Sequence, residues 1–161
     1  MNRIMLFEKF SRALQYEPTD EEYDDLIEQY YYHNTSKSNV QKIRGEGWNV
    51  GVTNRKKLYG NGVYFTKGEP NTRWGSEHIK VKVEPKKVLY DPDGDLRYED
   101  NPLGQEILDR CGLRYAEENY ELWLDALNEF IKENKYDCMF TTEFGKEILV
   151  VFDTSIINDD I

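Results

Sequence analysis

The sequence predicts a single α+β domain. Apolar residues recur at helical spacing in two N-terminal segments and again over residues 114–134, whereas residues 78–84 alternate strictly between apolar and charged side chains. Two β-rich runs, 136–142 and 146–153, flank a tight turn at Glu143-Phe144-Gly145 and predict a final strand pair. The 161 residues match the size of one domain, taken as residues 1–161.

Residues 1–29 are expected to form a helical extension before a core over residues 30–157. The first helix is indicated by apolar residues at positions 4, 7, 10 and 14, and it ends before Pro18. The second begins at a capping box, in which the Thr19 hydroxyl and the Glu22 carboxylate satisfy each other's backbone N–H groups. Both helices are amphipathic, so we expect them to pack on the core.

The core begins with an extended tyrosine-rich segment from Tyr30, followed by a short helix that Ser36 caps. Gly45 and Gly47 are expected to end this helix with positive φ angles. A glycine turn then leads into a strand that reaches residue 66, and further strands are expected at 78–84 and 88–90. Residues 148–152 are apolar without alternation, which predicts a central strand covered on both faces.

The charge balance is acidic, with 21 Lys and Arg against 31 Asp and Glu and a formal net charge of −10. Such a charge repels phosphate backbones, so nucleic acid is not expected as a direct ligand. No apolar run approaches the ~20 residues of a membrane helix, and no signal peptide is apparent, so we expect a cytoplasmic monomer. Seven acids and no base lie within residues 17–28, whereas bases gather within residues 37–57.

Three residues stand out as candidates for chemistry. His33 ends the first core strand, Tyr64 follows a double-glycine turn, and Glu147 begins a strand that is otherwise apolar. A carboxylate that enters a buried strand has to be paired, hydrogen-bonded or placed at a cleft. The alternatives without a chemical role are a histidine at a strand end, a tyrosine packed in the core and a glutamate at the edge of a turn.

Taken in order, the motifs around these residues resemble the His–Tyr–Glu signature of the ADP-ribosyltransferase fold, in its diphtheria-toxin and poly(ADP-ribose)-polymerase branch. The motifs are Tyr32-His33-Asn-Thr-Ser, then Tyr59-Gly-Asn-Gly-Val-Tyr64-Phe-Thr, and finally Lys146-Glu147-Ile-Leu-Val-Val-Phe-Asp. The resemblance covers roughly residues 30–157. The ending through Ile156-Ile157 is typical of small bacterial and phage-borne members.

The resemblance implies two packed, mostly antiparallel sheets that form a cleft for NAD. It also implies mono-ADP-ribosyl transfer from NAD to a protein target, with release of nicotinamide, by an intracellular effector. Glu147 would stabilise the oxocarbenium-like transition state, His33 would bind the ribose, and Tyr64 would stack on the nicotinamide. The other residues implied at the cofactor site are Asn34, Thr35, Tyr59, Gly62, Trp74 and Arg55.

Two departures from the family pattern bear on activity. Asn34 stands where the family has a glycine, whose backbone approaches the nicotinamide closely. Glu147 lies six residues before Asp153, where five are expected, and an offset of one residue in a strand turns a side chain to the other face. Glu143 therefore stays an alternative acid, and an inactive relative that binds NAD stays open.

A rival hypothesis is a non-catalytic acidic protein that imitates nucleic acid or blocks a basic partner. Its activity would lie in the acidic segments 17–28 and 91–100, on a degenerate ADP-ribosyltransferase fold. Under the enzyme hypothesis the same acidity favours a protein target with a basic surface.

Overall fold

The structure is a computed structural model that describes residues 17–50, 59, 61–98 and 101–160. Within these ranges the helices are α2 (Asp20–Glu28), α3 (Lys37–Glu46), α4 (Pro102–Cys111) and α5 (Tyr120–Asn134), with short 3₁₀ turns at Ala116–Glu118 and Thr154–Ile156. The strands are β1 (Tyr31–Thr35), β2 (Val63–Lys67), β3 (Glu77–Val83), β4 (Val88–Asp91), β5 (Cys138–Glu143), β6 (Lys146–Val151) and β7 (Ile157–Asn158).

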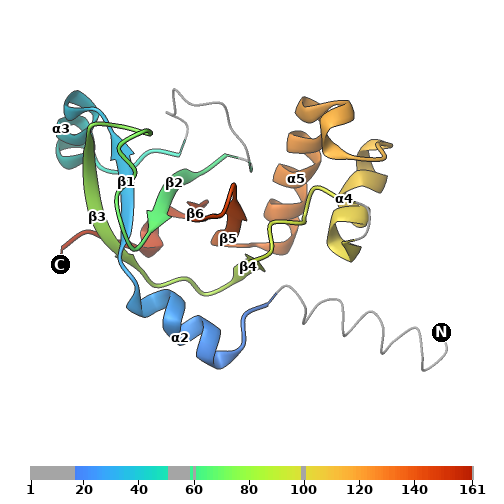
Figure 1. Cartoon of the computed structure of the whole chain (residues 1–161), viewed down its shortest axis with the longest axis horizontal. Coiled ribbons are helices and arrows are strands. Elements are labelled where there is room, and N and C mark those ends of the chain that lie inside the picture. Colours follow the sequence, from blue (N-terminus) through green and yellow to red (C-terminus); the bar gives the residue numbers. More distant parts are fainter. Residues whose placement is uncertain (1–16, 51–58, 60, 99–100, 161) are drawn as a thin grey trace.

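Hydrogen bonds join the seven described strands into one curled sheet with the order β4-β5-β6-β2-β1-β3-β7 (Figure 1). The β4–β5 pair is parallel, and all the other pairs are antiparallel. The α+β class and the mostly antiparallel pairing are therefore confirmed.

The sequence predicts two packed sheets, whereas the structure has a single pairing order. The joint lies between β2 and β6, where Tyr64 is opposite Val150 and Phe65 is opposite Leu149. Because this antiparallel register is continuous, the C-terminal hairpin extends the sheet that β1 and β3 begin.

The N-terminal extension is described only in its second half. The capping box of α2 is present as predicted, with the Thr19 hydroxyl accepting from Glu22 N at 3.2 Å and Thr19 N donating to the Glu22 carboxylate at 3.0 Å. The first predicted helix, at residues 4–14, lies outside the described residues.

Helix α3 begins as the sequence predicts and ends at the second of the two predicted glycines. The Ser36 hydroxyl accepts from Asn39 N at 3.3 Å, which satisfies one of the open N–H groups of the first turn. Gly47, with φ +87°, ends the helix, whereas Gly45 lies inside it and does not have a positive φ. One glycine is enough to stop the helix because a single positive φ redirects the chain.

Helix α4 was not among the predicted elements. Its signals are local: the Asn101 side chain accepts from Gly104 N at 2.9 Å, Pro102 occupies the first turn, and Gly112 ends the helix with φ +70°. Helix α5 confirms the helix predicted from the apolar spacing over residues 114–134, but it begins at Tyr120 rather than residue 114, because Asn119 caps it after a 3₁₀ turn.

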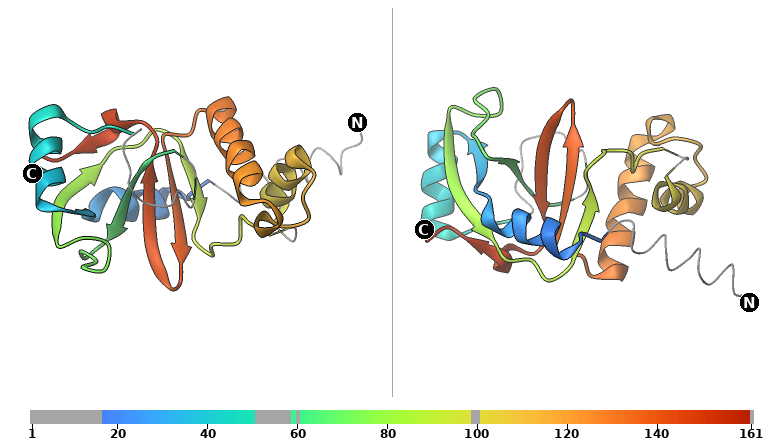
Figure 2. Two further views of the ribbon diagram at one scale, coloured as in Figure 1. Left: turned by 90° about the horizontal axis from the view of Figure 1, so that it is seen from above. Right: turned by 60° about the horizontal axis from the view of Figure 1, so that its bottom comes forward.

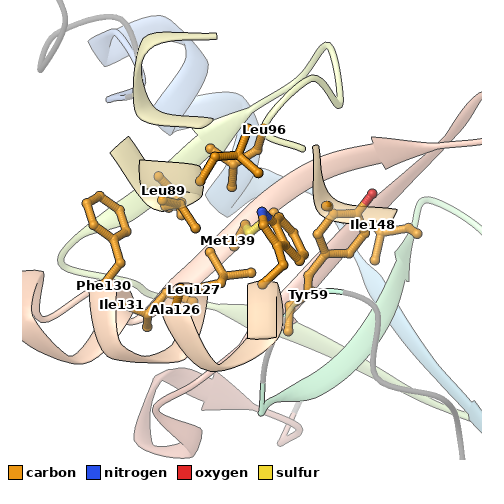
Figure 3. Packing of buried hydrophobic residues seen from close by; sticks show 14 residues of the cluster. Tyr59, Leu89, Leu96, Ala126, Leu127, Phe130, Ile131, Met139 and Ile148 are labelled. Carbon is orange, nitrogen blue, oxygen red and sulfur yellow. The ribbon is translucent and has the colours of Figure 1, made fainter. Parts of the chain in front are cut away.

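Two hydrophobic clusters pack on opposite faces of the sheet. Helices α4 and α5 cover one, which we call the α5 face, and α2 and α3 cover the other, the α3 face. In both views of Figure 2, α3 and α5 lie on opposite sides of the strands. Figure 3 shows the α5-face cluster, in which Leu127 and Phe130 of α5 lie beside Leu89 and Met139. The prediction of a covered central strand is confirmed, since residues 148–151 of β6 are all at most 1 % exposed.

None of the helices in the described ranges is both long and apolar enough to cross a lipid bilayer.

A buried carboxyl group ties β4 to its neighbours. Asp91, which is 1 % exposed, accepts hydrogen bonds from the Thr141 hydroxyl at 3.1 Å and from Asp95 N at 3.3 Å. Burial, followed by the hydrogen bond and negative charge of the Asp95 carboxylate, raises the pKa of Asp91 to about 7. Asp91 thus keeps its proton in the folded chain at pH values where it is ionised in the unfolded chain.

This proton makes stability depend on pH. Because the folded pKa is raised, the contribution of Asp91 is fully present below its unfolded pKa of about 3.9 and is lost as the pH rises through about 7. The unfolding free energy of the native protein should therefore fall between pH 4 and 8. In Asp91→Asn this fall should be smaller by more than about 1 kcal/mol. Urea unfolding across this range measures the slope; the exposed Asp93→Asn is the control, and equal slopes in both variants would contradict the assignment.

Candidate functional site

A pocket of about 310 Å³ lies between α3 and the β1–β2 pair. Helix α3, the segment after it, β1 and the start of β2 supply its walls. The lining residues are His33, Asn34, Asn39, Lys42, Ile43, Glu46, Gly47, Trp48, Asn49, Val50, Gly62, Val63 and Tyr64. Four of the residues that the sequence predicts for the cofactor site, His33, Asn34, Gly62 and Tyr64, are thus together.

The His33 ring is held by packing and by one backbone contact. Its Nδ1 lies 2.9 Å from the carbonyl oxygen of Tyr64, and the ring contacts Trp48 edge-on at 5.3 Å and Phe65 at 5.7 Å between centroids. Because a carbonyl only accepts, this contact places a proton on Nδ1 and makes Nε2 an acceptor in the neutral ring. The contact therefore fixes the orientation of the ring and the nitrogen that carries its proton.

Trp48 is a pocket residue that the sequence analysis missed. The positive φ of Gly47 turns the chain after α3, and the Trp48 ring then packs on Phe65 at 5.4 Å while its indole N–H donates to Asp159 at 3.2 Å. A large aromatic residue directly after a helix-ending glycine is the signal that was available.

Polar groups of α3 complete the wall. The Asn39 amide donates to the Thr35 hydroxyl at 3.0 Å, so Thr35 does not line the pocket but orients a residue that does. Lys42 and Glu46 also line the pocket and lie one helical turn apart. The described wall thus offers aromatic surface, amides and one charge of each sign.

Tyr64 connects the pocket to the α5 face. Its side chain packs against the α5-face cluster, and its hydroxyl accepts from Tyr59 N at 2.9 Å. Tyr59 itself is a core residue, 3 % exposed, and burial raises its pKa. Gly62 is required for close packing, because a Cβ there would lie 2.6 Å from a Val150 methyl.

Asn34 acts as a structural clamp at the pocket edge. It is 6 % exposed; its amide N–H groups donate to the Thr66 hydroxyl at 3.0 Å and to the Tyr32 carbonyl at 3.1 Å, and its oxygen accepts from Asn71 N at 2.8 Å. A glycine at this position would make none of these side-chain bonds. The side chain therefore fastens the turn after β2 to β1.

Glu147 does not line this pocket. It lines a second one, of about 490 Å³, at the other end of β2, and its carboxylate pairs with Lys67 Nζ at 2.9 Å. Lys67 also contacts Asp25 at 3.2 Å; burial alone would lower the pKa of Lys67, but its hydrogen bonds to the two carboxylates raise it. The predicted triad is therefore not brought together around one pocket.

Strand alternation accounts for this separation. Leu149 and Val151 belong to the α3-face cluster, and Glu147 shares their side of β6, whereas Tyr64 packs on the α5 face. The offset of one residue before Asp153 thus has the consequence that the sequence analysis described: Glu147 and Tyr64 lie on opposite faces.

Glu143, the alternative acid, lies on the α5 face. Its side chain is 9 % exposed and lies 3.9 Å from Arg97, whose guanidinium is over the rings of Tyr59 at 4.7 Å and Tyr120 at 5.4 Å. Trp74 also packs against the α5-face cluster. Arg55, the last predicted cofactor residue, lies outside the described residues.

No family model matches this chain. Likewise, neither the characterised proteins nor the solved structures include a significant match. Among the described residues, no three His, Cys, Asp or Glu side chains gather in a way that would hold a metal ion. The pocket and the sequence motifs therefore carry the functional argument.

The clamp formed by Asn34 can be tested by removing its side chain. Asn34→Ala should lower the free energy of unfolding by about 1–3 kcal/mol, because the Asn71 N–H loses its acceptor. Asn39→Ala, which breaks one hydrogen bond at the same pocket, should cost less. Equal losses in chemical unfolding of the two variants would contradict the structural role.

Proposed function

We propose that this protein is an NAD-dependent mono-ADP-ribosyltransferase whose pocket between α3 and the β1–β2 pair binds the nicotinamide-riboside half of NAD. The observation that carries the proposal is the contact between the His33 ring and the backbone carbonyl of Tyr64 at one pocket, although the two residues are 31 apart in sequence. The Tyr64 ring itself packs on the α5 face, so Trp48 rather than Tyr64 has the stacking role in this proposal. Asn34 and Gly62, which the family resemblance assigns to the same ligand, line it too.

Size and chemistry of the pocket fit half of a dinucleotide. Its volume of about 310 Å³ is at the lower end of the ~300–1,000 Å³ found for ligand pockets. The Trp48 ring supplies a surface for a flat ring, His33 Nε2 accepts from a ribose hydroxyl, and Lys42 attracts a phosphate.

The reaction breaks the bond between the ribose C1′ and the nicotinamide nitrogen, and the electron pair leaves with nicotinamide. A nucleophile of the target then forms the new bond to C1′. Because positive charge develops on the ribose, a fixed carboxylate nearby lowers the barrier. The resemblance gives this role to Glu147, which in this structure lines the second pocket and is paired with Lys67, so the proposal requires it to reach the ribose after that ion pair breaks; Glu143 is the alternative.

A second candidate function is NAD binding without transfer. It is favoured by the Glu147–Lys67 ion pair, which holds the carboxylate in a different pocket from His33. The acidic inhibitor hypothesis belongs to the same non-catalytic class.

Binding is tested with the two histidines of the chain. His33→Ala should weaken NAD binding at least about tenfold in isothermal titration, since it removes an oriented acceptor from the pocket. The control is His78→Ala on β3, which is exposed and packs on Tyr32 outside the pocket. Equal NAD affinities for the two variants would refute the proposed site.

Transfer is tested by replacing each of the two candidate acids with its amide. With NAD, a cell lysate and a nicotinamide-release assay, Glu147→Gln should lower the rate by about 10²–10³-fold, as for loss of a transition-state charge contact. Glu143→Gln serves as the matched comparison from the partner strand. A loss in Glu143→Gln alone would move the acid role to Glu143, and no release by the native protein would favour the non-catalytic function.

A further inference from the structure

The β5–β6 hairpin exposes an aromatic residue at its tip. Phe144 is 96 % exposed, and among the described residues the next most exposed large hydrophobic side chain is Tyr98 at 49 %. It stands with Gly145 in a two-residue turn, and both have positive φ angles, +50° for Phe144 and +75° for Gly145.

Neither feature stabilises the folded chain. An aromatic residue in the left-handed region is strained, and a turn of this kind favours Asn or Asp at the first position. The exposed ring gains nothing from burial, so folding alone favours another residue at position 144. Burial of the ring against a partner would give Phe144 a role that folding does not supply.

A groove of about 490 Å³ lies beside Phe144. The hairpin residues 144–147 form one wall, and residues 66–71 with Gln29 form the other. Phe144 and Pro70 supply apolar surface, while Glu69 and Glu147 supply carboxylates. An extended segment of another protein, with an aliphatic side chain against Phe144, fits this surface.

The surroundings of the groove are acidic. The groove lining itself holds two glutamates and two lysines, Lys67 and Lys146. Lys67 is paired with Glu147 and with Asp25 of α2, which brings α2 to the groove; the residue after this helix, Gln29, lines it. Helix α2 contains exposed acids and no basic residue. The exposed acids of α2 are Asp20, Glu21, Asp24, Asp25 and Glu28.

We propose that the β5–β6 hairpin tip and this groove bind a short protein segment in which an aliphatic residue is flanked by lysine or arginine. The aliphatic side chain packs on Phe144, and the basic residues face Glu69 and the acids of α2. The inference rests on the proposed function only in identifying this segment as the target of ADP-ribosyl transfer; the binding itself needs no NAD.

The test uses a fluorescent peptide with a central leucine pair flanked by lysines and arginines, and a second peptide with glutamates in place of the basic residues. In fluorescence anisotropy without NAD, Phe144→Asn should weaken binding of the basic peptide about tenfold (~1.4 kcal/mol). The same variant should raise the melting temperature, because asparagine tolerates the left-handed region better than phenylalanine. Tyr115→Asn, an exposed aromatic residue outside the groove, is the control and should leave binding unchanged.

The inference would be overturned by equal affinity of Phe144→Asn and the native protein, by equal binding of the two peptides, or by a native dimer that Phe144→Asn dissociates in sedimentation. The first outcome would show that Phe144 does not contribute to binding, and the second that the basic residues do not. The third would show that Phe144 serves self-association. Peptide binding without any nicotinamide release would support the inference and refute transfer. Nicotinamide release without peptide binding would support transfer and refute the inference.

Discussion

The alternation of side chains along β2 and its neighbours is the constraint on which the candidate site depends. Val63 and Phe65 pack on the α3 face, and Tyr64 packs on the α5 face between them in sequence. Both faces are covered by helices, so a shift of one residue would bury polar groups and expose apolar ones on each side. The register against β1 and β6 therefore decides which candidate residues meet. It brings His33 to the α3-side pocket and leaves Glu147 at the other end of the same face.

Features that depend on a few neighbouring residues were predictable from the sequence. The capping box at Thr19 and Glu22 and the Ser36 cap are made by side chains within three residues of their partners, and the aromatic stripe of α5 follows from its period. Helix α4 has equally local signals at Asn101 and Gly112, so it too was predictable from neighbouring residues.

Features that depend on distant residues were not predictable. The single sheet order follows from the pairing of Tyr64 with Val150, which no local pattern specifies. Half of the predicted cofactor set does meet at the pocket, because His33, Asn34, Gly62 and Tyr64 lie on one strand pair or at its end. Tyr59 and Trp74 pack with the α5-face cluster, and Trp48 enters the pocket only because Gly47 turns the chain back.

The net charge of −10 is unevenly distributed over the protein. Helix α2 carries exposed acids, and its Asp25 contacts Lys67 in the groove, whereas the pocket wall has Lys42 and Glu46.

The central claim is that the pocket between α3 and the β1–β2 pair holds the nicotinamide-riboside half of NAD. The most direct measurement is an NMR titration with NAD that follows the indole N–H signals of Trp48 and Trp123. Trp48 lines the pocket, and Trp123, a residue of α5, is fully buried on the other face of the sheet. The account predicts a saturable shift of the Trp48 signal with the Trp123 signal unchanged. An unchanged Trp48 signal at NAD concentrations that saturate binding would contradict it.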